Sequence, residues 1–254
     1  MINIILSGCN GRMGQAIVSL AQDSDKYNII AGFDAMDEKR NDFPVYSDFN
    51  QIKESADVMI DFSHISATST VLNYCKNKKL PLVLATTGIA GDLEQQVLDT
   101  AKSIPIFKSF NMSLGISLLL SLVRKAAKVL GETSDIEIIE KHHNQKLDAP
   151  SGTALMIADA ISDSLTFDTQ YIYDRSKEHK KRDHKEIGIH AVRGGNIIGE
   201  HEAMFIGGNE TITISHSAQS RVLFAEGALK ASEFIITKTT SGIYNMDDLV
   251  ASLI

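Results

Sequence analysis

Cysteine is scarce in this chain, and long apolar runs are absent from it. Only Cys9 and Cys75 occur among the 254 residues, sixty-six positions apart. That spacing fits neither a disulfide framework nor a zinc knuckle, so we expect a reducing, cytoplasmic setting. No stretch approaches about eighteen consecutive apolar residues, and the start, Met1 to Leu6, has no basic segment before its apolar residues. We therefore expect no export signal and no membrane span.

Positive charge is also in deficit. Lys and Arg number 25 against 32 Asp and Glu, and the formal net charge of −7 repels phosphate backbones and anionic lipid surfaces. A basic stretch at 175–185 is the exception, but acidic residues interleave with it, so we interpret it as a solvated loop able to steer an anionic substrate. Its basic members are Arg175, Lys177, Lys180, Lys181, Arg182 and Lys185. We expect neither a nucleic-acid nor a membrane partner.

Size and composition predict a folded protein. Apolar residues make up 43% of the chain and charged residues 22%, so burial can offset the entropy lost on ordering. At roughly 150 residues per domain, 254 residues correspond to one large domain or to two modest ones.

The first half of the chain alternates short β-branched runs with helical patterns, which is typical of a parallel sheet with crossover helices. We expect strands at 2–7, 28–33, 56–61, 81–85 and 104–107. Apolar residues at helical spacing predict helices at 12–22, 66–77 and 92–102. The predicted fold is α/β, a Rossmann-like doubly wound parallel sheet.

The pattern of predicted secondary structure changes near residue 135, after one long predicted helix at 113–130. Longer alternating strands are expected at 186–192, 197–206 and 210–216, which favours an α+β domain built on a mixed open sheet. A helix at 221–237 and a short amphipathic tail at 246–254 are expected to pack back on the first domain. The predicted division is a dinucleotide-binding domain of residues 1–112 plus 221–254, and a substrate-binding and oligomerisation domain of residues 113–220.

The glycine-rich run GCNGRMG, from Gly8 to Gly14, lies directly after the first strand and opens the first helix. Glycines there let the backbone approach a pyrophosphate, whose charge would face the free N–H groups of the helix. Asp34 ends the second strand, twenty residues beyond Gly14, where a carboxylate accepts hydrogen bonds from a ribose. The alternative is that the glycines only form a tight turn and Asp34 is a loop carboxylate. Cys9 is interpreted as a small packing residue, although a helix start can lower a thiol pKa and so favour oxidation.

The residue after that acid bears on the choice of cofactor. Asp34 would repel a 2′-phosphate, and Ala35 supplies no cation, so the local sequence leans towards NADH over NADPH. The side chain of Lys39 or Arg40 could still reach a 2′-phosphate, but each residue could equally be a solvated charge on the loop.

The run EKHHNQKLDAPSGTAL, residues 140–155, carries the second set of polar residues. His142, His143 and Lys146 are groups whose pKa values burial and neighbours can bring near neutrality. Pro150 to Thr153 predict a helix start whose N–H groups suit a carboxylate. A metal site is the competing interpretation, but adjacent histidines point in different directions and no ligand set is completed nearby, so we predict none. The plainer alternative is ordinary strand-end histidines and a Ser151 that caps a helix.

These motifs resemble the 4-hydroxy-tetrahydrodipicolinate reductase family, also called the dihydrodipicolinate reductase family. The runs from His142 to Ala154 and from Gly8 to Gly14 carry the resemblance, and it extends along essentially the whole chain. The supporting runs, in the expected order, are Asp61-Phe62-Ser63, Ala85-Thr86-Thr87-Gly88, Asn111-Met112-Ser113-Leu114-Gly115, Gly199-Glu200-His201 and Ser220-Arg221.

The resemblance implies a role for each matching position. His142 would be the acid/base residue and Lys146 the proton donor, while His143, Gly152 and Thr153 would bind a substrate carboxylate. The implied cofactor-binding residues are Gly8, Cys9, Asn10, Gly11, Arg12, Met13, Asp34, Ala85, Thr86, Thr87, Ser109, Phe110, Asn111 and Met112. Relatives often carry basic residues where Asn144 and Gln145 stand here, so part of the carboxylate affinity is expected from elsewhere, with Arg193 as a candidate.

The resemblance also implies an activity and an assembly. Members reduce a cyclic, imine-containing dicarboxylate with NADH or NADPH in the diaminopimelate route to lysine, and form a homotetramer through the sheet of the second domain. Two alternatives stay open, namely another two-domain dehydrogenase of amino or semialdehyde acids and a non-catalytic nucleotide sensor.

Overall fold

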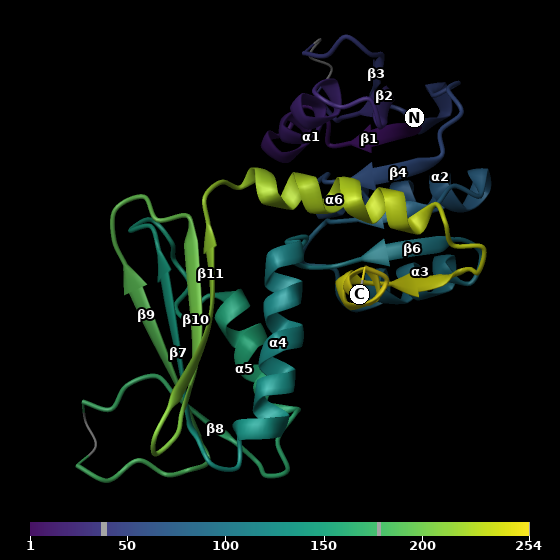
Figure 1. The fold of residues 1–254 in the computed structure, drawn as a ribbon. Helices are drawn as coiled ribbons and strands as arrows, with labels where there is room; N and C mark the ends of the chain where they lie inside the picture. Colours follow the sequence, from purple (N-terminus) through teal and green to yellow (C-terminus); the bar gives the residue numbers. More distant parts are fainter. Residues whose placement is uncertain (37–39, 177–178, 254) are drawn as a thin grey trace. The chain divides into compact units, whose positions relative to one another are not determined.

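The computed structural model describes residues 1–36, 40–176 and 179–253, and the chain divides into two compact units (Figure 1). The first unit comprises Met1–Leu114 and Val222–Ile254, and the second comprises Gly115–Arg221. The second unit is thus inserted into the sequence of the first.

The first unit is built on a parallel sheet of seven strands in the order β12-β6-β5-β4-β1-β2-β3. Neighbouring strands in it run parallel, so their carboxyl ends share one edge. The strands are β1 (Ile2–Ser7), β2 (Tyr27–Phe33), β3 (Val45–Tyr46), β4 (Val58–Asp61), β5 (Leu82–Leu84), β6 (Pro105–Lys108) and β12 (Gly242–Tyr244). The helices are α1 (Arg12–Gln22), α2 (Thr68–Lys78), α3 (Asp92–Ala101), α6 (Val222–Ile235) and α7 (Met246–Ala251), with 3₁₀ turns η1 (Phe49–Gln51) and η2 (Ile65–Ala67).

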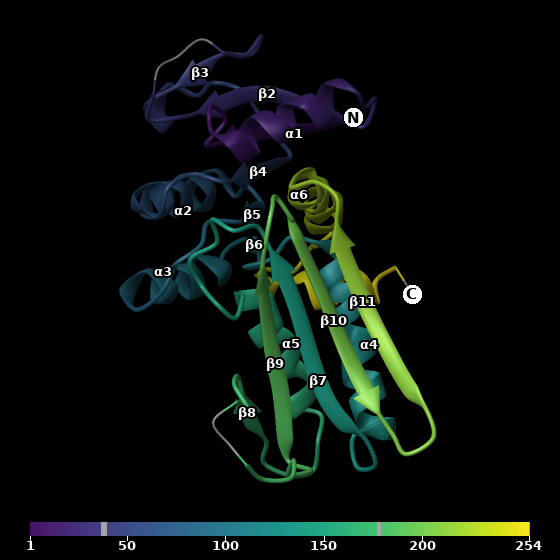
Figure 2. The same ribbon diagram turned by 90° about the vertical axis from the view of Figure 1, so that its left-hand side faces the viewer.

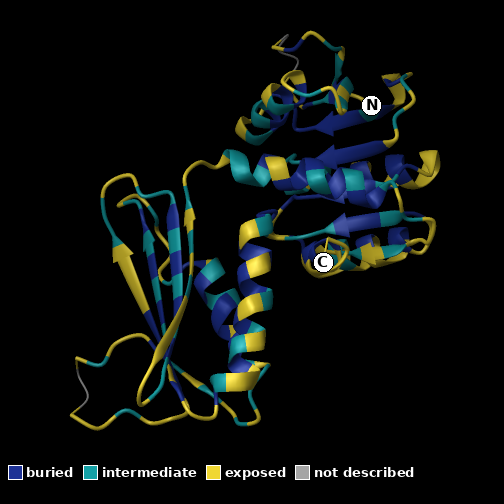
Figure 3. Cartoon of the chain, viewed as in Figure 1, coloured by how far each residue is buried: buried dark blue, intermediate teal, exposed yellow. Residues whose placement is uncertain are grey.

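Helices cover both faces of this sheet. Because strand side chains alternate, Ile4 and Leu6 of β1 pack into a core with α1 and α6, whereas Ile5 packs into a second core with α2 and α3. The central strands β4 and β5 are buried throughout (Figure 3). This arrangement confirms the predicted Rossmann-like α/β fold.

The second unit has a five-stranded sheet in the order β11-β10-β7-β9-β8. Strands β7, β8 and β9 pair in parallel and β10 pairs antiparallel with both neighbours, which confirms the predicted mixed sheet. Its strands are β7 (Asp135–His142), β8 (Gln170–Ile172), β9 (Glu186–Arg193), β10 (Gly199–Ile206) and β11 (Thr211–Ala218), and its helices are α4 (Leu114–Leu130) and α5 (Gly152–Ser162). The helices lie on one face, and the other face is turned to the viewer in Figure 2.

Strict alternation in β7 decides which side chains turn towards the helices. Ile136 and Ile138 are buried in the core with α4 and α5, and Glu140 and His142 follow on the same face. A carboxylate and an imidazole are therefore carried to the end of the strand on its buried side.

The basic stretch at 175–185 differs from the solvated loop that we predicted. The side chain of Arg182 is only 17% exposed, and its Nη1 and Nε lie 2.8 and 3.1 Å from carboxylate oxygens of Asp135 and Glu137. Arg175 forms an ion pair with Glu186. Lys177 lies outside the described residues. The interpretation was wrong for Arg182 because its guanidinium meets carboxylates that are distant in sequence, at the start of β7.

The short strands β3, β8 and β12 were not predicted. Each has two or three residues, too few for periodicity to register, and each forms by pairing with a longer neighbour. Within the described ranges, no helix combines the length and the apolar character needed to cross a bilayer.

Candidate functional site

The glycine-rich turn between β1 and α1 is tightly packed against the chain itself. Gly8 has φ of +78°, and a Cβ on it would lie 2.7 Å from the backbone of Phe62. A Cβ on Gly14 would lie 2.2 Å from the carbonyl oxygen of Gly8. Helix α1 has Gly11 as its N-cap and no side-chain capping hydrogen bond, which leaves the helix start suited to a phosphate.

Asp34 joins the end of β2 to this turn. It is 9% exposed, and its Oδ2 accepts the backbone N–H of Asn10 at 2.9 Å. Its Oδ1 accepts the N–H of Met36 at 3.1 Å. The expected ribose-binding carboxylate therefore lies directly beside the expected pyrophosphate turn. Lys39 lies outside the described residues.

Two further side-chain amides hydrogen-bond to the glycine-rich turn, and nothing in the sequence led us to expect either. Asn41 donates from Nδ2 to Oδ1 of Asn10 at 3.0 Å, and Gln15 donates from Nε2 to the Cys9 carbonyl at 2.8 Å. Asn41 is distant in sequence from the turn, so no local pattern pointed to it.

The side chain of Cys9 faces the hydrophobic core of the first unit. It is fully buried and packs where Gly32 of β2 leaves room. Burial, assisted by the negative charge of Asp34, raises its pKa to about 12. The alternative expectation of a lowered thiol pKa and of sensitivity to oxidation was therefore wrong, whereas the predicted packing role of the side chain is confirmed.

A buried carboxylate organises the carboxyl ends of β4 and β5. Asp61 is fully buried and accepts hydrogen bonds from the hydroxyls of Ser63 at 2.6 Å and Thr86 at 2.7 Å. Ala85 is buried beside Thr86, and Thr87 is exposed. These residues lie at the same sheet edge as Asp34, because β2, β1, β4 and β5 pair in parallel.

The segment after β6 presents a mixture of exposed and buried residues. Ser109 Oγ donates to the carbonyl of Asn111 at 2.8 Å, and Phe110 is 63% exposed. Met112 is 3% exposed and packs on Gly227 of α6, where a Cβ would lie 1.6 Å from the Met112 carbonyl oxygen. The Met112 side chain therefore belongs to the core.

In the second unit, Glu140 is the centre of a buried polar cluster. It is fully buried, and its Oε1 and Oε2 accept from Arg193 Nη2 and Nη1 at 2.6 and 2.8 Å. Its Oε2 lies 2.6 Å from Nδ1 of His142, and its Oε1 accepts the N–H of Ser151 at 2.9 Å. Burial by itself would raise the pKa of Glu140, but the hydrogen bonds from Arg193, His142 and Ser151 outweigh it and lower the pKa.

This cluster corrects the expectation that Arg193 binds a substrate carboxylate. Besides Glu140, its terminal nitrogens donate to the carbonyls of Val192 and Asp148, at 2.8 and 2.7 Å. The terminal N–H groups are thus used within the chain, and the guanidinium is engaged in holding Glu140.

Ser151 caps α5 and connects the cluster to His201 of β10. Its Oγ accepts the N–H of Ala154 at 3.1 Å and lies 3.0 Å from Nε2 of His201. The rings of His201 and His142 meet edge to face, with centroids 5.2 Å apart. Burial, reinforced by the electrostatic influence of the neighbouring His142, lowers the pKa of His201 to about 4, so this ring is neutral at pH 7.

The remaining predicted residues lie around this cluster. Lys146 Nζ is 2.8 Å from Oδ1 of Asp148, and this hydrogen bond lowers the pKa of Asp148. His143 Nε2 lies 3.3 Å from Nη2 of Arg221, a cation for which the sequence reasoning named no role. A Cβ built on Gly152, at the first turn of α5, would meet no atom within 4 Å. Strand β7, the following loop and the start of α5 therefore bring His142, His143, Lys146 and the helix N-terminus together.

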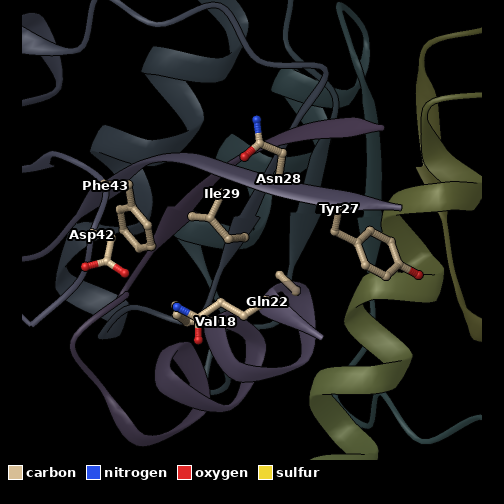
Figure 4. Close-up of a pocket in the computed structure, with 8 residues that line it drawn as sticks. Val18, Gln22, Tyr27, Asn28, Ile29, Asp42 and Phe43 are labelled. Carbon is tan, nitrogen blue, oxygen red and sulfur yellow. The ribbon is translucent and has the colours of Figure 1, made fainter. Parts of the chain in front are cut away.

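A cavity of about 300 Å³ in the first unit lies apart from the predicted residues (Figure 4). It opens beside α1 and the start of β2, and Tyr27 points from it towards α6 and donates to Glu233. Its lining residues are Val18, Ala21, Gln22, Tyr27, Asn28, Ile29, Asp42 and Phe43. Because Asp34 follows the opposite end of β2, this cavity is not part of the candidate site.

Comparisons with known proteins cover the whole chain. The family description "Dihydrodipicolinate reductase, N-terminus" matches residues 2–112, and "Dihydrodipicolinate reductase, C-terminus" matches residues 115–250. A 4-hydroxy-tetrahydrodipicolinate reductase of Caldanaerobacter subterraneus subsp. tengcongensis is 53% identical over 250 residues, 98% of each chain. One of Clostridium tetani is 49% identical, over 99% of this chain and 98% of the relative.

Solved structures agree on the fold. A dipicolinate-bound dihydrodipicolinate reductase from Paenisporosarcina sp. TG-14 matches with a TM-score of 0.82 at 24% identity, over 96% of this chain and 97% of the other. A myo-inositol dehydrogenase from Corynebacterium glutamicum matches with a TM-score of 0.61 at 13% identity, over 100% and 93%.

Proposed function

Because this chain belongs to the dihydrodipicolinate reductase family, we propose that it reduces 4-hydroxy-tetrahydrodipicolinate to tetrahydrodipicolinate in the diaminopimelate route to lysine. The family assignment makes it an NAD(P)H-dependent oxidoreductase. The observation that carries the proposal is the buried His142, held by Glu140 beside Lys146 and the start of α5. That set combines an acid/base group, a cation and an anion-binding helix terminus.

Cofactor binding is assigned to the first unit. The uncapped start of α1, Asp34 and the edge formed by Ala85–Thr87 and Ser109–Met112 fit a dinucleotide, whose pyrophosphate would face the glycine turn. Met112 would contribute backbone only, and Cys9 likewise. When bound, the reduced nicotinamide supplies the hydride. NADH is the preferred form in this proposal, since Asp34 is negative and the exposed Ala35 offers no cation to a 2′-phosphate.

Substrate binding is assigned to the second unit. The N–H groups of Gly152 and Thr153, with His143, would hold a carboxylate of the substrate. Lys146, as an ammonium, would attract the dianion and donate the proton to the reduced substrate, and His142 would act as acid or base. Arg221 adds positive charge beside His143.

Self-association is assigned to the sheet face that α4 and α5 leave uncovered. Ile139, Met204 and Ile206 lie on that face and are only partly buried, and Val192 is 45% exposed. These apolar side chains support the predicted homotetramer. The cytoplasmic location predicted from the cysteine usage belongs to the same proposal, supported by two buried free thiols.

The test is the loss of reduced-nicotinamide absorbance with substrate generated in situ by the preceding synthase, run in parallel with NADH and NADPH. Oxidation that depends on the synthase product is expected, with the larger kcat/KM for NADH. Failure of a folded, NADH-binding sample to oxidise either cofactor would refute the activity, and binding without turnover of any substrate would favour a nucleotide sensor.

A further inference from the structure

Glu140 makes four contacts, and one of them is to the proposed acid/base residue. Two of the others come from Arg193 and one from the N–H of Ser151. The fourth partner is Nδ1 of His142, at 2.6 Å. A carboxylate whose pKa is held down can only accept hydrogen bonds, so the proton of this contact is carried by Nδ1.

The other ring nitrogen of His142 is directed towards Gly199 of β10. A Cβ at that position would lie 3.0 Å from Nε2, closer than the ring tolerates without moving. Because residue 199 is a glycine, no side chain at this position of β10 crowds Nε2 of His142. The ring is thus held through Nδ1 and kept clear at Nε2.

The charges that face His142 come from each element packed around it. Glu140 on β7 is negative, and Arg193 on β9 is positive and paired with it. His201 on β10 is neutral near pH 7, and Ser151 at the start of α5 contributes a hydroxyl and an N–H. Because Arg193 balances the charge of Glu140, the main effect of Glu140 on His142 is directional.

We propose that Glu140 is a positioning residue for the reductase reaction, holding His142 as the tautomer protonated at Nδ1 and leaving Nε2 to exchange the proton with the substrate. The inference rests on the proposed function, because it needs His142 to be the acid/base residue. It adds a part for Glu140 and Gly199, to which the sequence assigned no role, and gives Arg193 a different part from the carboxylate binding expected of it. Arg193 and the Ser151 N–H fix the carboxylate, and Gly199 keeps the working nitrogen clear.

A second carboxylate on the same strand supplies a matched control. Glu137 Oε2 lies 2.8 Å from Nε2 of His190, and its Oε1 accepts from Arg182 Nε at 3.1 Å. This group repeats the chemistry of Glu140 on the opposite face of β7, away from α5. Glu137→Gln therefore removes an equivalent carboxylate without touching His142, and sedimentation shows whether its assembly is unchanged.

The kinetic experiment compares Glu140→Gln, Glu137→Gln and the double variant Glu140→Gln/Arg193→Gln. Loss of a positioned acid–base group costs about 100- to 10,000-fold, so we expect Glu140→Gln to lower kcat within that range and to leave the Kd for NADH unchanged. Glu137→Gln is expected to keep the wild-type kcat. In Glu140→Gln the buried Arg193 is left without its carboxylate partner. The double variant removes that unpaired cation, so we expect it to be more stable than Glu140→Gln while its kcat stays low.

The direct readout is the protonation of the two His142 nitrogens, followed by ¹⁵N NMR and assigned by comparison with His142→Asn. Wild-type protein at a pH where His142 is neutral should carry the proton at Nδ1 alone, and Glu140→Gln should show a mixture of tautomers. This readout needs no turnover. Absence of turnover in wild type would therefore refute the proposed function, while the NMR would still decide whether Glu140 fixes the imidazole.

Three results would overturn the inference. The first is a wild-type His142 protonated at Nε2. The second is an unchanged kcat in a folded Glu140→Gln variant whose tautomers have become mixed. The third is a kcat that returns in the double variant together with its stability, because that would make Glu140 a structural ion-pair partner only.

Discussion

Protonation of His201 is expected to make the stability of this protein depend on pH. The residue is 5% exposed, Nε2 lies 3.0 Å from Ser151 Oγ, and Nδ1 is buried with no hydrogen-bond partner among the described residues. A charged ring there would lose its hydration, and the neighbouring imidazole of His142 would further disfavour its charge. Burial first, and the influence of the nearby His142 second, lower the pKa of His201 from 6.5 to about 4.

The magnitude follows from this difference in pKa. At 1.36 kcal/mol per pKa unit, the interval between 6.5 and about 4 corresponds to about 3 kcal/mol. Between those pH values the unfolded chain binds a proton at His201 and the folded chain does not. The free energy of unfolding is therefore fully retained above pH 6.5 and falls as the pH is lowered towards about 4. A loss of that size is a large part of the stability of an ordinary domain.

The assay compares wild type with His201→Gln in urea unfolding at several pH values between 7.5 and 4. Circular dichroism is the suitable probe, since the chain contains no tryptophan. Glutamine cannot be protonated but can still contact Ser151. The advantage of wild type over the variant should shrink by about 3 kcal/mol across the range, because the carboxylates titrate in both proteins.

Two results would refute this reasoning. One is a stability difference between wild type and His201→Gln that does not change with pH. The other is a His201 resonance in the folded protein that titrates near the ordinary value of 6.5.

The other predictions concern catalysis and the cofactor. Lys146→Met should lower kcat by about 100- to 10,000-fold in the absorbance assay with the Kd for NADH unchanged, and an undiminished kcat would remove Lys146 from the proton-donor role. Gly14→Ala puts a methyl group 2.2 Å from the Gly8 carbonyl oxygen, so calorimetry should show NADH affinity reduced by about tenfold or more, whereas Gly208→Ala, with open space around it, should bind normally. Ala35→Arg should raise the ratio of kcat/KM for NADPH over NADH by about tenfold, and a constant ratio would show that position 35 does not read the 2′-phosphate.

Several features of this protein are readable in its sequence because their causes are local. The helix predicted at 12–22 has those bounds in the structure, and β1 follows its predicted range. The glycine turn between them is specified by residues within one run. The motif from His142 to Ala154 likewise keeps its histidines, lysine and helix start within one loop, so a resemblance carried by that run identified the family.

Glu140 shows where a local pattern was sufficient but was not used. It stands two residues before His142, and the period of two in a strand places both side chains on one face. That spacing alone is enough to suggest Glu140 as the partner of His142.

The remaining partners were decided by the tertiary structure. Arg193 is fifty-three residues from Glu140, and the parallel register that sets His142 opposite Arg193 brings the guanidinium onto that carboxylate. The antiparallel register of β10 on β7 sets His201 opposite Glu140 and so brings its imidazole to the same cluster. Burial, which neutralises His201 and raises the pKa of Cys9, likewise depends on what packs above each residue. A strand's sequence determines which side chains share a face, but the strand that lies beside it, and in which register, is determined by packing between segments far apart in the chain.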